Sequence, residues 1–233
     1  MKKRHFIIVG FATSILSIIF GSAILFQLNS KKNDNIVQLS KMKKSLDERL
    51  TLQRLAYTKF DLAEINFGVS HLLPEKGKSN YRFGVQKMLE ESDTFLFCAA
   101  YGLSEDFANR IINFLNISRH DEDTEFSDLE DQKFTEGKQP KLDKLIDLLK
   151  LTSAIQYYDE IDNFSELSYQ RESLKEEIIF LFYTNLDTHN KAISAIKSKN
   201  EKINFWFSFS TYLSICLQIV GLIIIFLKDL GSD

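Results

Sequence analysis

Two long uncharged hydrophobic runs lie near the two ends of this chain. The second, residues 205–227 (FWFSFSTYLSICLQIVGLIIIFL), has 23 residues and no Asp, Glu, Lys or Arg. The first, residues 6–28, has the same length and is also uncharged. About 20 apolar helical residues are needed to cross the roughly 30 Å hydrocarbon core of a bilayer. The pattern therefore predicts transmembrane helices at residues 6–28 and 205–227.

The first run is expected to be a signal anchor that is not cleaved. It follows a basic tail at residues 1–5, as in a secretory signal peptide. However, the run exceeds the usual apolar core of about 7 to 15 residues, and no small-residue cleavage site clearly ends it. A second short tail, residues 228–233, follows the other span.

The region between the spans, residues 29–204, has the periodicity of helices. Its apolar residues recur every three to four positions, and the whole chain has only two prolines and nine glycines. We therefore predict an all-α fold, in which a helical-bundle domain lies between two transmembrane helices that continue into long stalk helices. Within it we expect helices at residues 81–101, 104–116, 141–160 and 165–228.

An apolar seam with alternating spacings of three and four follows the first span and is typical of helix packing. Its clearest members are Ile36, Leu39, Leu46, Leu50, Tyr57 and Phe60, and Ile193 and Ile196 extend a matching seam before the second span. Polar residues such as Lys43 and Gln53 interrupt it. We interpret it as one face of a helical bundle rather than an isolated coiled coil, ending at the turn that Pro74 and Gly77 favour.

Small and polar residues form a stripe on each predicted span. The stripes are Gly10, Ser14, Ser17 and Gly21 on the first, and Thr211, Ser214, Gln218 and Gly221 on the second. Small residues let membrane helices approach closely, and polar ones form hydrogen bonds across the contact. We interpret the stripes as helix packing and oligomer contacts. A water-lined path through an oligomer is the alternative for the second stripe.

The remaining composition argues against catalysis, metal and nucleic acid. The net charge is near −3, the four histidines are scattered, and the two cysteines, Cys98 and Cys216, form no ligand or redox motif. The acidic segment at about 118–140 is predicted to be a loop. It does not match a calcium loop, because Phe126 and Gln132 occupy the positions of the required Gly and Glu. We expect no enzyme activity and no cofactor.

The charges beside the spans favour a cytoplasmic middle domain by a small margin. Nine Lys residues flank the spans on the domain side, against four Lys or Arg in the tails. The basic residues 1–5 argue for the opposite orientation, because a basic start resists translocation. On either orientation the flanking lysines lie near anionic lipid headgroups. Abundant Lys, Ile, Asn and Phe indicate an AT-rich genome, as in many bacteria.

Two hypotheses for the function follow. The first is a scaffold or sensor subunit of the inner or plasma membrane, whose helical domain mediates oligomerisation or binds a protein partner. This outline resembles bacterial sensors that place a helical bundle between two spans. The alternative is a membrane-permeabilising effector or small channel, for example a bacterial defence or toxin component, with a pore lined by the second span.

Overall fold

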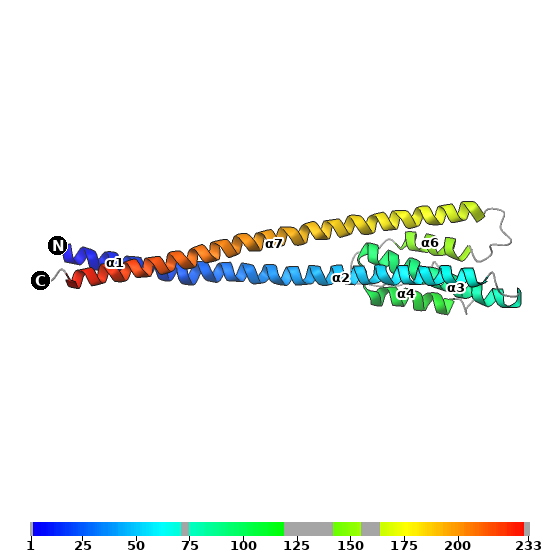
Figure 1. The fold of residues 1–233 in the computed structure, drawn as a ribbon, viewed down its shortest axis with the longest axis horizontal. Coiled ribbons are helices and arrows are strands. Elements are labelled where there is room, and N and C mark those ends of the chain that lie inside the picture. The colour runs from blue at the N-terminus through cyan, green and yellow to red at the C-terminus, as the bar shows by residue number, and fades with distance from the viewer. Residues whose placement is uncertain (1, 71–74, 119–141, 155–163, 231–233) are drawn as a thin grey trace. The chain divides into compact units, whose positions relative to one another are not determined.

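The described residues of the chain form helices and no strand (Figure 1). The structure, a computed structural model, describes residues 2–70, 75–118, 142–154 and 164–230. The helices are α1 (Lys2–Ile19), the π-helix η1 (Phe20–Ile24), α2 (Leu25–Ser70), α3 (Glu75–Tyr101), α4 (Glu105–Ser118), α6 (Asp143–Ala154) and α7 (Phe164–Leu230). The all-α prediction is therefore confirmed.

The chain divides into two compact units. Unit 1 comprises Met1–Lys43 and Asn190–Asp233, and unit 2 comprises Lys44–His189. Helices α2 and α7 contribute residues to both units, since neither is interrupted at the boundary. Unit 1 contains the two hydrophobic runs, and unit 2 contains α3, α4 and α6.

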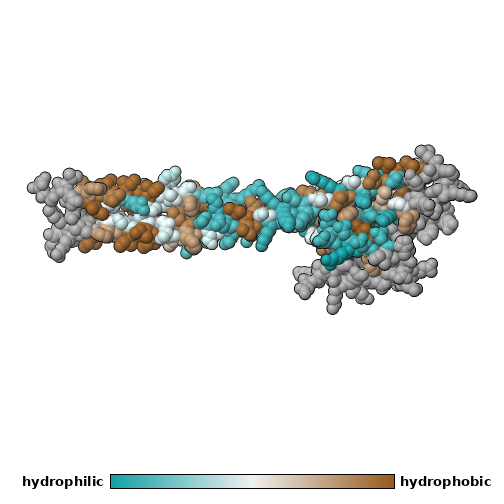
Figure 2. Space-filling model, turned by 90° about the horizontal axis from the view of Figure 1, so that it is seen from below, coloured by the Kyte–Doolittle hydropathy of each residue, from teal (hydrophilic) through white to brown (hydrophobic). Residues whose placement is uncertain are grey.

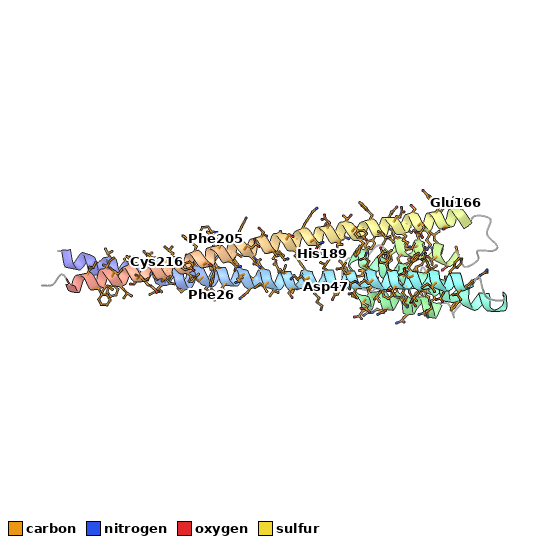
Figure 3. The ribbon with its side chains drawn as sticks, viewed as in Figure 1. Phe26, Asp47, Glu166, His189, Phe205 and Cys216 are labelled. Atoms are coloured by element: carbon orange, nitrogen blue, oxygen red, sulfur yellow. The ribbon has the colours of Figure 1, made fainter. Side chains whose placement is uncertain are left out.

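Two helical stretches are long and apolar enough to cross a membrane, one in each hydrophobic run. Only 12% and 17% of their most apolar windows are buried inside the chain, so most of this apolar surface faces outward (Figure 2). A core helix of a soluble domain buries this surface. Phe26 and Phe205, 75% and 65% exposed, lie at corresponding levels of the two helices (Figure 3). Such aromatic residues are enriched at membrane–water interfaces.

The helix boundaries follow the local signals in the sequence, with two differences. Helix α3 begins at Glu75, six residues before the predicted start, so Gly77 lies inside this helix and not in the predicted turn. The predicted helix end near residue 160 lies outside the described residues. The π-helix η1 interrupts the first run, where an unbroken α-helix was expected. The predicted acidic loop falls almost wholly in residues 119–141, outside the described residues.

The turn after α3 has the geometry that Gly102 allows. Gly102 has a φ of 70°, the Leu103 N–H donates to the Cys98 carbonyl at 2.9 Å, and the Ser104 Oγ accepts the Phe107 N–H at 3.2 Å. The first bond closes the C-terminus of α3 and the second caps the N-terminus of α4. Gly102 and Ser104 therefore fix the turn between α3 and α4.

Replacing Gly102 by Ala is expected to lower the free energy of unfolding by about 1 to 2 kcal/mol, because L-residues disfavour positive φ. The added Cβ would also collide with the Arg49 guanidinium. The matched control is Gly84→Ala in the interior of α3, where a Cβ meets nothing within 4 Å. This control should raise stability by up to about 1 kcal/mol. Thermal unfolding followed by circular dichroism measures both, and effects of the same sign would contradict the prediction.

The core of unit 2 lies among α2, α3, α4, α6 and α7. Its fully buried side chains include Leu52, Phe97, Cys98, Ile111, Leu145, Leu148, Leu149, Ile178 and Phe182. Burial raises the pKa of the Cys98 thiol, which is therefore neutral and shielded at neutral pH.

Candidate functional site

The two polar stripes meet in unit 1 through a reciprocal serine contact. The Ser17 hydroxyl donates to the Ser214 carbonyl at 2.9 Å, and the Ser214 hydroxyl lies 3.2 Å from the Ser17 carbonyl. The two hydroxyl oxygens are 3.0 Å apart, and both side chains are buried. Inside a bilayer no water competes for these groups. The contact therefore ties the two runs together, and we call the paired segments, residues 8–28 and 205–227, the span pair.

Glycines make the close approach in the span pair. A Cβ on Gly221 would lie 2.9 Å from the Thr13 Oγ1 and 3.4 Å from the Gly10 carbonyl, and one on Gly10 would lie 3.1 Å from Ile225 Cγ1. Gly10 faces Gly221 and Ser17 faces Ser214, seven residues apart on each helix in opposite directions. The helices are thus antiparallel. Gly21, within η1, lies beside Ser214, where a Cβ would be 3.2 Å from its Oγ.

The other stripe residues have different surroundings. Ser14 is half-buried and its hydroxyl donates to the Gly10 carbonyl at 3.0 Å. Thr211 is also half-buried and donates to the Phe207 carbonyl within its own helix. Gln218 is exposed. Ser214 and Gly221 consequently face the first run inside the span pair. Of the second stripe, only Gln218 and part of Thr211 lie on the outer surface.

The predicted seam on α2 differs from the face that the structure buries. The residues of α2 that are almost fully buried are Leu52, Ala56 and Ala63, whereas Ile36 and Tyr57 are 46% and 42% exposed. Leu39, Leu46, Leu50 and Phe60 are half-buried, and Ile193 and Ile196 of α7 are buried. Small alanines allow close helix approach but give a weak hydrophobic signal in the sequence.

A buried ion pair, which the sequence reading missed, joins α3 and α7 in unit 2. The Arg171 Nη2 lies 3.0 Å and 2.9 Å from the two carboxylate oxygens of Asp93, whose side chain is fully buried. The Thr152 hydroxyl of α6 donates to Asp93 at 2.7 Å and accepts the Arg171 Nε–H at 2.9 Å. Burial raises the pKa of the Asp93 carboxyl, and Arg171 opposes that shift. The triad therefore links three helices.

Further polar groups extend this triad along the same helices. Buried Glu90 accepts hydrogen bonds from Gln86 at 2.7 Å and from Ser153 at 3.1 Å. Lys175, one turn after Arg171, lies 3.8 Å above the Phe60 ring of α2. Burial lowers the pKa of Lys175. Phe60 of the predicted seam thus makes a cation–π contact with Lys175 of α7.

Several polar groups and one thiol of unit 2 are buried where its helices pack. Within the described residues, no group of three or more His, Cys, Asp or Glu could hold a metal ion. The Asp93 carboxylate accepts from Arg171 and Thr152, and the Cys98 thiol is buried and neutral. These contacts fix α3, α6 and α7 to one another.

An aromatic face lies on the outer side of α7 in unit 2. Tyr169, Phe180 and Tyr183 are 75%, 74% and 51% exposed, and Tyr169 and Phe180 are eleven residues apart, which places them on the same side of a helix. Exposed aromatic residues are enriched in protein–protein interfaces. We call these three residues the α7 aromatic face.

Comparisons with known proteins give no relative for this chain. No family model, no curated protein and no solved structure matches it.

Proposed function

We propose that this protein is an integral membrane scaffold or sensor subunit whose helical domain binds a partner protein or further copies of the chain. The two spans would anchor it in the inner or plasma membrane, with the domain on the cytoplasmic side. The observation that carries the proposal is the continuity of α2 and α7. Helix α7 combines the whole second candidate span with part of unit 2 in a single unbroken helix. Helix α2 begins at Leu25, after η1, and continues from the end of the first run into unit 2.

This continuity supports two roles for α7: it could transmit a movement from unit 2 to the membrane span, or it could attach unit 2 rigidly to that span. An α-helix rises about 1.5 Å per residue and resists bending unless Pro or a similar defect interrupts it. Helix α7 has no Pro between Arg171, which is tied to α3 and α6, and Ser214, which is tied to the first span. A partner that shifts α7 in unit 2 would therefore act on the same helix that enters the membrane.

The α7 aromatic face supports protein binding by unit 2. It combines large apolar side chains with tyrosine hydroxyls, and neither Tyr169 nor Phe180 is covered by the described parts of the chain. Burying one such ring removes enough apolar surface from water to contribute about 1.5 to 3 kcal/mol. The proposed partner therefore covers Phe180.

A photo-crosslinking amino acid at position 180 tests this proposal in intact cells. We expect one discrete protein adduct from position 180 and none from Thr188, an exposed residue of unit 2 about 80° around the helix from Phe180. Mass spectrometry of the adduct distinguishes a second copy from a different protein. Absence of any adduct at position 180, or equal labelling at both positions, would contradict protein binding by this face.

A further inference from the structure

Gln218 carries a side-chain amide that the span pair leaves unused. Its side chain is exposed, and no hydrogen bond joins it to any residue that the structure describes. Its two polar neighbours on the stripe differ, because Ser214 bonds to Ser17 and Thr211 bonds to the Phe207 carbonyl. The amide has two N–H donors and one carbonyl acceptor. The tertiary structure therefore separates Gln218 from the rest of the stripe.

The depth of Gln218 makes an unused amide costly. It lies two residues beyond Cys216, the midpoint of residues 205–227 (Figure 3), which corresponds to about 3 Å along the helix axis. At this depth water is absent and lipid tails offer neither donor nor acceptor. A polar side chain within a span faces protein or a water-filled cavity rather than lipid. The partner of this amide thus comes from outside the span pair.

We propose that a second copy of this chain covers this face, with the two Gln218 amides forming reciprocal hydrogen bonds. Copies related by an axis normal to the membrane place the same residue at the same depth, and an amide complements another amide. Ile215 and Leu222, three residues before and four after Gln218, are 46% and 55% exposed and would pack beside the pair. The inference rests on the proposed function, in which both runs cross the membrane.

Disulfide crosslinking of the full chain in native membranes tests the proposed contact. In a Cys216→Ala background, Leu222→Cys introduces a thiol beside Gln218, and Cys98 stays shielded in the core of unit 2. Ile223→Cys is the matched control, because Ile223 is 50% exposed at nearly the same depth but on another side of the helix. Under a mild oxidant we expect at least fivefold more covalent dimer from Leu222→Cys than from Ile223→Cys.

Adding Gln218→Leu to Leu222→Cys is expected to lower the dimer yield roughly fivefold to tenfold, since interhelical bonds between polar side chains in membranes are modest. Equal crosslinking of the two cysteine variants, no dimer, or a yield insensitive to Gln218→Leu would each overturn the proposal. So would a disulfide-linked adduct with a different protein, because it would show another partner on this face.

A second cysteine pair separates failure of this inference from failure of the proposed membrane architecture. Ser17→Cys with Ser214→Cys should form a disulfide within one chain, since the parent hydroxyls are 3.0 Å apart. If that bond forms but Leu222→Cys gives no dimer, the span pair stands and the Gln218 contact is wrong. If it does not form, both the span pair and the inference are overturned.

Discussion

Replacing Arg171 by Met is expected to lower the free energy of unfolding by about 3 kcal/mol at pH 7, because removing one partner of a buried ion pair leaves an uncompensated charge. Met approximates the length of Arg but cannot donate to the two Asp93 oxygens or to Thr152. The Asp93 side chain is fully buried, so water does not replace these donors. Urea unfolding followed by circular dichroism in detergent measures the loss.

The loss should shrink as the solution is acidified. Burial already raises the pKa of Asp93, and removing Arg171, which opposes that shift, raises it further. A carboxyl whose pKa is higher in the folded state contributes more stability below its folded pKa and loses it as the pH rises. The deficit of Arg171→Met relative to the parent should therefore decrease between pH 7 and about pH 4, the ordinary pKa of an unfolded Asp.

Two further variants isolate the buried charge as the cause. The double variant Arg171→Met with Asp93→Leu removes both charges and should recover most of the stability. Lys144→Met is the matched control, because the Lys144 Nζ pairs with Glu177 at 2.6 Å but both side chains are largely exposed. It should change stability by less than about 1 kcal/mol. A double variant that is no more stable than Arg171→Met would contradict this account.

Gly221→Leu is expected to separate the span pair. A Cβ at this position would already lie 2.9 Å from the Thr13 Oγ1 and 3.1 Å from the Ser14 Oγ. These hydroxyls are held by hydrogen bonds to the Gly10 carbonyl at 2.9 Å and 3.0 Å, so they do not move aside without losing them. Overpacking of this kind costs about 1 to 3 kcal/mol or more. The intrachain disulfide of Ser17→Cys with Ser214→Cys should therefore form at least tenfold more slowly.

The control for this prediction is the adjacent substitution Val220→Leu. Val220 is 46% exposed in the span pair, so a larger apolar side chain projects away from the other helix and should leave the rate of disulfide formation unchanged. Gly221→Ala, which adds a single methyl group, should give an intermediate rate. If Gly221→Leu forms the disulfide as fast as the parent pair, the close contact between Gly10 and Gly221 does not exist in the membrane.

The sequence by itself determined the helical class, the two membrane-compatible runs and the ends of several helices. These features depend on local chemistry. The length and lack of charge of a 23-residue run are sufficient to predict a membrane span. Gly102 favours the end of one helix, and Ser104 favours the start of the next. The start of α3 was less accurate. It lies in a charged stretch with weak periodicity.

Only the tertiary structure decided which side chains meet. Periodicity assigns a residue to a helix face but does not select the opposing helix, so Ser17 gave no indication of Ser214, 197 residues away, nor Asp93 of Arg171, 78 residues away. It also assigned Ser214 and Gln218 to one stripe, although the structure buries the first and exposes the second. The physical reason is that burial depends on the distance and crossing of two helices, which are set by long-range packing and not by the spacing of residues along either one.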